Sequence, residues 1–195
     1  MSLYNIDEDK LKIAFVVFND MTILDFAGVY DALTRLKELK IKTDLDWDIC
    51  GYSDTVRDKH GLKIIPDKVR NNLGKYDVVI VPGGLGTRSL QNDGEFIDWI
   101  KTAENVQYKI SVCTGSLILG AAGFLKGKKA TTNFNEYESL GQYCGEVVKE
   151  RIVEDQDIIT SGAVSSSIDL GLYLCEKWAG KEARQKIREM IDYQS

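Results

Sequence analysis

Residues 108–125 read YKISVCTGSLILGAAGFL and place a cysteine between two different sequence patterns. A short apolar run that contains Ile110 and Val112 precedes Cys113, and a segment rich in helix-forming residues follows from Gly115. A buried strand that is followed at once by a helix predicts a sharp turn between them. Cys113 lies on this predicted turn, where its sulfur would meet the first turn of the helix.

The position of Cys113 leaves two interpretations open. The positive end of a helix dipole favours a thiolate over a thiol, which would make the sulfur a nucleophile. The predicted geometry is that of a nucleophile elbow, although Ser111 and Gly115 do not match the G-x-S-x-G pattern literally. Alternatively, Cys113 is a small hydrophobic residue of the core.

Three other apolar runs have the composition of buried strands: residues 12–18, 45–52 and 76–81. Helices are predicted at residues 25–39, 95–104, 164–178 and 182–193. Because strands and helices alternate, the sequence predicts an α/β fold with one open, mostly parallel, doubly wound sheet of the flavodoxin-like type. We expect a single domain over residues 1–195, with a core at about 12–178 and a C-terminal helix at about 182–193.

Shorter segments are predicted from turn residues. Residues 55–65 predict a hairpin or a pair of short strands around His60, an exposed turn residue. Pro66 and Asp67 suggest the start of a helix that ends near Gly74. Residues 147–153 and 157–160 predict two short strands, and residues 135–140 predict a short helix.

Loops that carry polar residues, glycines or the cysteine follow the predicted strands. In a doubly wound sheet these loops lie at the carboxyl edge, where such folds bind ligands. Gly83 and Gly84 would let backbone N–H groups approach a ligand closely, and an oxyanion hole fits them better than a phosphate site if Cys113 is a nucleophile. Asp25 can also be explained as a helix N-cap. The expected site gathers Asp25, Gly83, Gly84, Cys113, Ser161 and Gly162.

Composition limits the classes of function. The chain has 195 residues, of which 44% are hydrophobic and 28% are charged, with a net charge of −5 and no basic block. This balance argues against nucleic acid or an anionic membrane as the main partner. Four widely spaced cysteines without a zinc or disulfide pattern are typical of the reducing cytoplasm. His60 is the only histidine, so no multi-histidine metal site is expected within one chain, and no cofactor is predicted.

Five short motifs in a fixed order resemble the ThiJ/PfpI superfamily, whose fold is related to class I glutamine amidotransferases. The resemblance runs from about residue 12 to about residue 178 and covers nearly the whole chain. The ordered set is specific, whereas each motif alone is weak. The motifs are L-D-F-A-G at residues 24–28, V-P-G-G at 81–84, S-V-C-T-G-S at 111–116, G-K-K-A-T-T at 127–132 and T-S-G at 160–162.

The superfamily resemblance implies roles for individual residues. It implies that Cys113 is the nucleophile and that Asp25 is the nearby carboxylic acid. It also implies an oxyanion hole from the backbone N–H groups of Gly84 and Thr114, with Thr114 counted among the catalytic residues. A homodimer is a further expectation from this resemblance.

Two positions separate the branches of the superfamily. Protease-like members usually carry a glutamate where this chain has Asp25 and a histidine where it has Thr114. An aspartate together with Cys-Thr-Gly-Ser resembles the isocyanide hydratases instead. These hydratases, and similar sensor domains of transcription factors, typically have His-Trp where this chain has Asn133 and Phe134, which changes the expected pocket wall. The expected pocket residues are Gly83, Asn133, Phe134, Ser161, Gly162 and Ala163.

The hydratase resemblance implies chemistry on an isocyanide carbon, which is electrophilic toward a thiolate. Attack by Cys113 would give a thioimidate after protonation, and water would then release an N-substituted formamide. Asp25 and Thr114 would supply proton transfer and polar contacts to water. The same residues could serve a protease/amidase-like or glyoxalase-like enzyme. A non-enzymatic redox or ligand sensor is a second class of hypothesis.

Overall fold

A seven-stranded sheet forms the centre of the molecule in the computed structural model, which describes residues 10–194. The strand order is β10-β11-β7-β6-β1-β2-β5, and every neighbouring pair is parallel except β10 with β11. The strands are Leu11–Val17 (β1), Leu45–Gly51 (β2), Lys68–Val69 (β5), Val78–Val81 (β6), Tyr108–Val112 (β7), Ile152–Asp155 (β10) and Ile158–Ser161 (β11).

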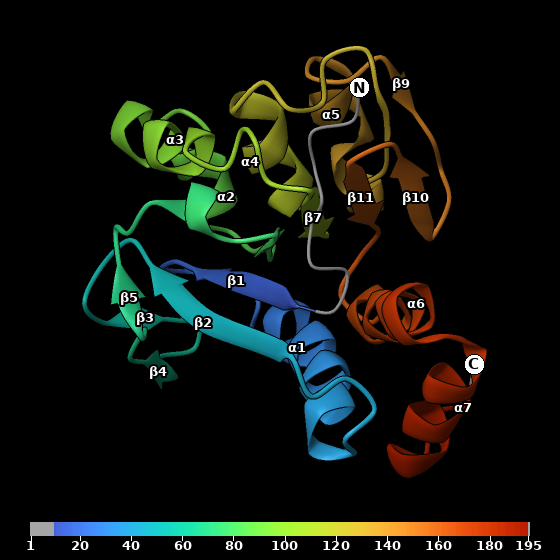
Figure 1. The fold of residues 1–195 in the computed structure, drawn as a ribbon. Helices are drawn as coiled ribbons and strands as arrows, with labels where there is room; N and C mark the ends of the chain where they lie inside the picture. The colour runs from blue at the N-terminus through green and yellow to red at the C-terminus, as the bar shows by residue number, and fades with distance from the viewer. Residues whose placement is uncertain (1–9, 195) are drawn as a thin grey trace, which may run out of the picture.

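Helices cover both faces of this sheet (Figure 1). On one face α1 packs against α6 and α7, and the other face carries α2, α3, α4 and α5. The helices are Ile23–Glu38 (α1), Thr87–Leu90 (α2), Gly94–Lys101 (α3), Gly115–Ala121 (α4), Tyr137–Gly141 (α5), Ser166–Ala179 (α6) and Lys181–Met190 (α7). Two small two-stranded sheets complete the described part, β3 (Val56–Arg57) with β4 (Lys63–Ile64) and β8 (Lys129–Ala130) with β9 (Glu146–Val147).

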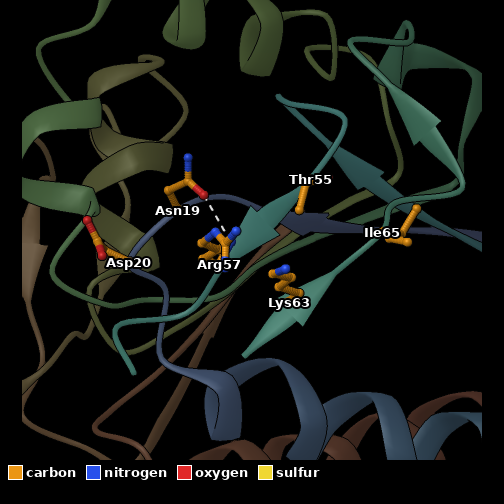
Figure 2. A pocket seen from close by; sticks show the side chains of 6 residues that line it. All are labelled: Asn19, Asp20, Thr55, Arg57, Lys63 and Ile65. Atoms are coloured by element: carbon orange, nitrogen blue, oxygen red, sulfur yellow. Dashed lines mark hydrogen bonds between the residues drawn. The ribbon is translucent and has the colours of Figure 1, made fainter. Parts of the chain in front are cut away.

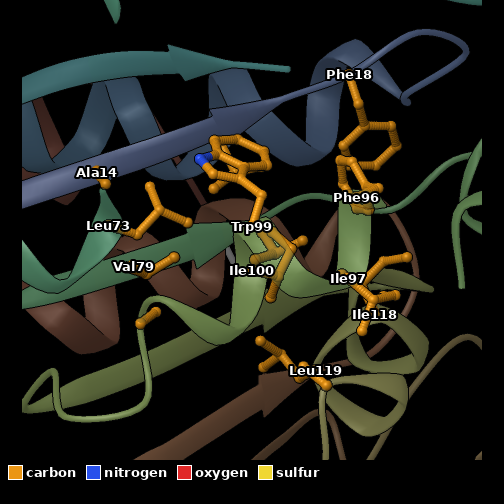
Figure 3. Close-up of a cluster of buried hydrophobic side chains, with 14 of the residues drawn as sticks. Ala14, Phe18, Leu73, Val79, Phe96, Ile97, Trp99, Ile100, Ile118 and Leu119 are labelled. Carbon is orange, nitrogen blue, oxygen red and sulfur yellow. The ribbon is translucent and has the colours of Figure 1, made fainter. Parts of the chain in front are cut away.

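The central strands are apolar on both sides because each side faces a separate hydrophobic cluster. In β1, Ala14 and Val16 belong to one buried cluster, and Ile13 and Phe15 belong to the other. This pattern explains why the strand reads as a nearly continuous apolar run rather than an alternating one. Figure 3 shows part of the first cluster, in which the aromatic residues Phe18, Phe96 and Trp99 lie with Leu73, Ile100 and neighbouring aliphatic side chains.

The predicted fold class is confirmed. The described chain has one doubly wound, mostly parallel α/β sheet, and the strand, turn and helix predicted around Cys113 are β7 and α4. The predicted hairpin at residues 55–65 is the β3–β4 pair, and His60 is exposed in its turn. The predicted break at Gly180 separates α6 from α7, and this glycine has a φ of 87°.

The helix predicted from Pro66 to Gly74 is wrong. The chain forms the short edge strand β5 there, followed by a single 3-10 turn at Leu73–Lys75. Asp67 accounts for the difference, because its backbone N–H donates to the Ile49 carbonyl at 2.9 Å and its Oδ2 accepts from the Ile49 N–H at 2.8 Å. These two bonds fix the segment beside β2, and they join residues that are distant in sequence.

Other boundaries also differ from the sequence prediction. The strand predicted at residues 147–153 is two strands, β9 and β10, because its two ends pair with different partners. The helix predicted at residues 135–140 begins as a 3-10 turn, Phe134–Glu136, and continues as α5. Helix α1 has Thr22 at its N-cap, so Asp25 lies buried in the first turn and is not the N-cap.

None of the helices within residues 10–194 is long and apolar enough to cross a membrane. The ends of the predicted domain, residues 1–9 and 195, lie outside the described residues.

The contact between α1 and α6 depends on Gly28. A Cβ atom at this position would lie 2.2 Å from Ser167 Oγ and 3.1 Å from the Ile168 backbone nitrogen. Gly28→Ala should therefore lower the free energy of unfolding by roughly 1–3 kcal/mol, although alanine is the better helix former. Chemical denaturation measures this change. Gly94→Ala is the control, because the space around that helical glycine is open and alanine there should be neutral or stabilising.

An unchanged denaturation midpoint for Gly28→Ala would mean that α6 moves away from α1 at little cost in free energy. The close contact between the two helices would then not be needed for stability.

Candidate active site

Cys113 lies between β7 and α4 with a φ of 53°, in the left-handed region that non-glycine residues rarely adopt. Four hydrogen bonds hold this conformation. Its N–H donates to the carbonyl oxygens of Ser161 and Gly162, each at 3.0 Å. Its carbonyl oxygen accepts from Ser116 Oγ at 3.1 Å and from Thr132 Oγ1 at 3.0 Å. The thiol-bearing residue is therefore fixed from both sides of its peptide backbone.

Asp25 reaches the site from the first turn of α1 and is completely buried. Its Oδ2 accepts a hydrogen bond from the Gly83 N–H at 3.0 Å. A Cβ atom at Gly83 would lie 2.9 Å from this oxygen and 2.6 Å from the Thr114 nitrogen, so only glycine allows such a close approach. Oδ1 is buried and has no hydrogen-bond partner within the described residues.

Burial raises the pKa of the Asp25 carboxyl from 3.8 to about 7, against the opposing effects of the Gly83 N–H and of Cys113. Burial and the charge of Asp25 also raise the pKa of the Cys113 thiol. The expected preference for a free thiolate is therefore opposed by the surroundings of the sulfur. The two groups interact and titrate as a pair, so a state that holds one proton between them becomes populated as the pH rises through about 7.

Three N–H donors face the Cys113 sulfur and favour its anionic form. Asn133 Nδ2 lies 3.4 Å from Sγ, and the backbone N–H groups of Thr114 and Val164 also lower the pKa of this thiol. The side chain of Phe134, by contrast, is 66% exposed. The structure thus brings Asn133 to the sulfur and leaves Phe134 on the surface beside it.

The Thr114 hydroxyl contacts the glycine turn. Thr114 Oγ1 accepts from the Gly84 N–H at 3.0 Å, and it lies 3.2 Å from the Gly84 carbonyl oxygen. Thr87 Oγ1, which is fully buried, lies 3.0 Å from Thr114 Oγ1 and donates to the Gly84 carbonyl at 2.8 Å. The Gly84 N–H would have to leave this network to bind an oxyanion, so the oxyanion hole stays a prediction.

Three further residues predicted to line the pocket, Ser161, Gly162 and Ala163, lie at the end of β11 and in the loop that follows it. Ser161 and Gly162 contribute the carbonyl groups that hold the Cys113 N–H, and the Ser161 hydroxyl donates to the Ser111 carbonyl at 3.4 Å. Ala163 accepts from the Ser166 N–H at 3.1 Å in the turn that leads into α6. Apart from the Ser161 hydroxyl, these contacts are made by backbone groups, and the role of the three residues in a substrate pocket stays a prediction.

An open groove lies elsewhere, beside the β3–β4 hairpin (Figure 2). It has a volume of about 740 Å³, and none of the predicted site residues lines it. The Asn19 side chain accepts from the Arg57 backbone N–H at 2.9 Å on its wall. The residues that line it are Asn19, Asp20, Thr55, Arg57, Lys63 and Ile65.

Sequence reasoning missed four residues that shape the site. Thr132 and Ser116 hold the Cys113 carbonyl, Thr87 holds the glycine turn, and Val164 presents its N–H to the sulfur. Thr132 and Ser116 lie inside motifs that support the superfamily resemblance, which is a signal that could have found them. Thr87 and Val164 lie outside those motifs and act through contacts that the sequence pattern does not reveal.

These elements define an α/β protein with a buried cysteine on a strand-to-helix turn and a carboxylic acid beside it. The DJ-1/PfpI family profile matches residues 11–177, and the chain belongs to that family.

Individual relatives cover most of the chain. It is 35% identical over 185 residues to the isonitrile hydratase of Pseudomonas putida. This match covers 94% of this chain and 78% of the hydratase. It is 26% identical over 188 residues to the HTH-type transcriptional regulator GbdR of Pseudomonas aeruginosa, over 94% of this chain and 51% of the regulator. The crystal structure of a THiJ/PfpI family protein from Pseudomonas syringae matches with a TM-score of 0.84 and 29% identity, over 95% of this chain and 76% of that one.

The raised pKa of Asp25 predicts a pH-dependent effect on stability. Because the folded state binds this proton more tightly than the unfolded state, the stabilisation is complete below about pH 4 and is lost as the pH rises through about 7. Asp25→Asn carries no charge and can still accept from the Gly83 N–H. Its unfolding free energy relative to wild type should increase by roughly 1–4 kcal/mol from about pH 4 to about pH 8.

Denaturant titrations at the two pH values measure this difference. Asp98→Asn, which replaces an exposed carboxylate on α3, is the control and should show little pH dependence. The same stability difference for Asp25→Asn at both pH values would mean that Asp25 ionises like an exposed aspartate.

Proposed function

We propose that this protein is a cysteine-dependent enzyme that hydrates an isocyanide to an N-substituted formamide. The observation that carries the proposal is the buried pair of Asp25 and Cys113, in which both pKa values are raised. Such a pair keeps one proton at the reacting centre near neutral pH, and the proposed reaction needs a nucleophile and a proton donor together.

Addition begins when a proton passes from the Cys113 thiol to the Asp25 carboxylate. The sulfur electron pair then forms a bond to the isocyanide carbon, and the same carbon takes the proton from the Asp25 carboxyl. The product is a thioimidate, with the Cys113 sulfur bonded to a carbon that now carries one hydrogen. Asp25 ends this step as a carboxylate, ready to act as a base.

Hydrolysis uses Asp25 a second time. Its carboxylate accepts a proton from water while the water oxygen adds to the thioimidate carbon, and the proton passes on to the nitrogen. The resulting tetrahedral intermediate then loses its hydroxyl proton to Asp25, the carbon–sulfur bond breaks, and the electron pair returns to the Cys113 sulfur. The formamide leaves, and the pair again holds one proton.

The contacts of the glycine turn support this reaction over amide hydrolysis. Amide hydrolysis develops negative charge on a carbonyl oxygen, and an enzyme needs free N–H groups to stabilise it. Here the Gly83 N–H is bonded to Asp25 and the Gly84 N–H is bonded to Thr114. Addition to an isocyanide carbon creates no such oxygen in its first step, so those bonds can stay in place.

Similarity to known proteins supports the proposed enzyme activity, and it also supports a second candidate function. The similarity to isonitrile hydratase over 94% of the chain favours the reaction above. The similarity to GbdR, also over 94% of the chain, favours a ligand-sensing role without turnover. Protease/amidase-like or glyoxalase-like activity and redox sensing through Cys113 are the remaining alternatives. We also propose a cytoplasmic location, without nucleic acid or membrane as partner.

Turnover of alkyl and aryl isocyanides, followed by formamide production, tests the enzyme proposal. Cys113→Ala should abolish turnover, and Asp25→Asn should lower it by roughly 10²-fold or more, because the proton has no carrier. Cys144→Ser is the matched control, since this half-buried cysteine lies after α5 and outside the site. Wild-type turnover should rise with pH through about 7, as the pair loses its first proton, and fall again at alkaline pH.

The competing activities need their own assays on the same preparation. Cleavage of casein or peptide anilides, with isocyanides left untouched, would establish the protease/amidase alternative. Binding of a small electrophile without turnover would favour the sensor.

A homodimer is proposed from the family resemblance. Light scattering at micromolar concentration should give a mass of about twice 21.9 kDa, the mass of one chain. A species of 21.9 kDa under these conditions would contradict it.

A further inference from the structure

The Asn133 side-chain amide is oriented at both of its ends. Its Oδ1 accepts a hydrogen bond from the Asn135 backbone N–H at 2.9 Å. Its Nδ2 lies 3.4 Å from Cys113 Sγ. Exchanging the two ends would place an oxygen against the sulfur and a donor against a backbone N–H, which would cost both bonds. The 3-10 turn that follows Asn133 thus fixes an N–H donor on the reacting atom.

Burial strengthens the hydrogen bond from Asn133 to the sulfur, and the amide can donate it at any pH. Cys113 is only 4% exposed, and a hydrogen bond to an anion gains strength where water is excluded. An amide does not titrate, so the donor is present at every working pH. Within residues 10–194, the titratable group that acts on the sulfur is Asp25, from α1. On the side of Asn133, Glu136 is paired with Arg88 of α2 at 2.6 Å.

We propose that Asn133 is a catalytic residue that stabilises the Cys113 sulfur whenever it carries negative charge. That charge is present when the thiol has given its proton to Asp25, and again when the sulfur leaves the tetrahedral intermediate. In the second case the carbon–sulfur bond breaks, its electron pair moves to Sγ, and the hydroxyl proton goes to the Asp25 carboxylate. The effect on turnover rests on the proposed function, whereas the effect on the thiol does not.

Asn133→Leu removes the donor with little change in size. Alkylation of Cys113 by iodoacetamide across the pH range, read by peptide mass, reports the thiolate directly. We expect alkylation roughly 10- to 100-fold slower near pH 8 and a pH profile displaced to higher pH. Asn135→Ala is the matched control, because it keeps the backbone N–H that orients Asn133, and its profile should match wild type.

Asn133→Asp is a second variant of nearly identical shape. It places a carboxylate beside the sulfur, so alkylation should be slower still, and a preserved thermal unfolding transition would show that the fold is intact. If both variants are folded and alkylate with the wild-type pH profile, the proposal is overturned. If the profile moves as expected while wild type leaves isocyanides untouched, the role of Asn133 at the sulfur stands and the hydratase function fails.

With isocyanide turnover established, Asn133→Leu should lower kcat by a similar factor, with KM changed much less. A loss confined to KM would instead assign Asn133 to substrate binding and would overturn its proposed role on the sulfur.

Discussion

The left-handed backbone of Cys113 is the constraint on which the candidate site depends. A residue with a side chain rarely adopts this conformation unless its surroundings hold it there. Here β11 and the loop after it supply carbonyl groups to its N–H, and Ser116 and Thr132 supply hydroxyl groups to its carbonyl. Residues from three separate segments thus hold the two peptide groups that flank the Cα atom of Cys113, and the direction of the thiol follows from this.

The hydrogen-bond donors around the thiol fall into two groups that bind different acceptors. Gly83 and Gly84 direct their N–H groups to Asp25 and Thr114, and so they fix the acid and the turn. Asn133, Thr114 and Val164 direct N–H groups to the sulfur. The N–H groups of Gly83 and Gly84 are thus already bonded within the protein, whereas the three donors that face the sulfur partly offset the effect of burial on the pKa of the Cys113 thiol.

The sequence predicts most strongly where local patterns decide the structure. The apolar runs of β1 and β6, the turn at Cys113 and the α/β alternation all follow from spacing within short windows, and the structure contains them. The segment after Pro66 was mispredicted because Asp67 pairs with Ile49 across 18 residues. Thr87 acts on Thr114 across 27 residues, and Asn133 acts on Cys113 across 20. Such pairings depend on the assembled sheet, so no local pattern reveals them.

The close contact of α1 with α6 has a consequence for the site far from the contact itself. Gly28 lies three residues after Asp25 in α1, and Ser167, near the start of α6, lies three residues after Val164 in the turn that leads into that helix. The contact between Gly28 and Ser167 therefore lies close in sequence both to the Asp25 carboxyl and to the Val164 N–H, so the separation of the two helices influences the distance between these groups. A larger residue at either Gly28 or Ser167 would push the two helices apart and shift Asp25 relative to the sulfur, whereas a substitution at the exposed Phe134 would leave this helix contact unchanged.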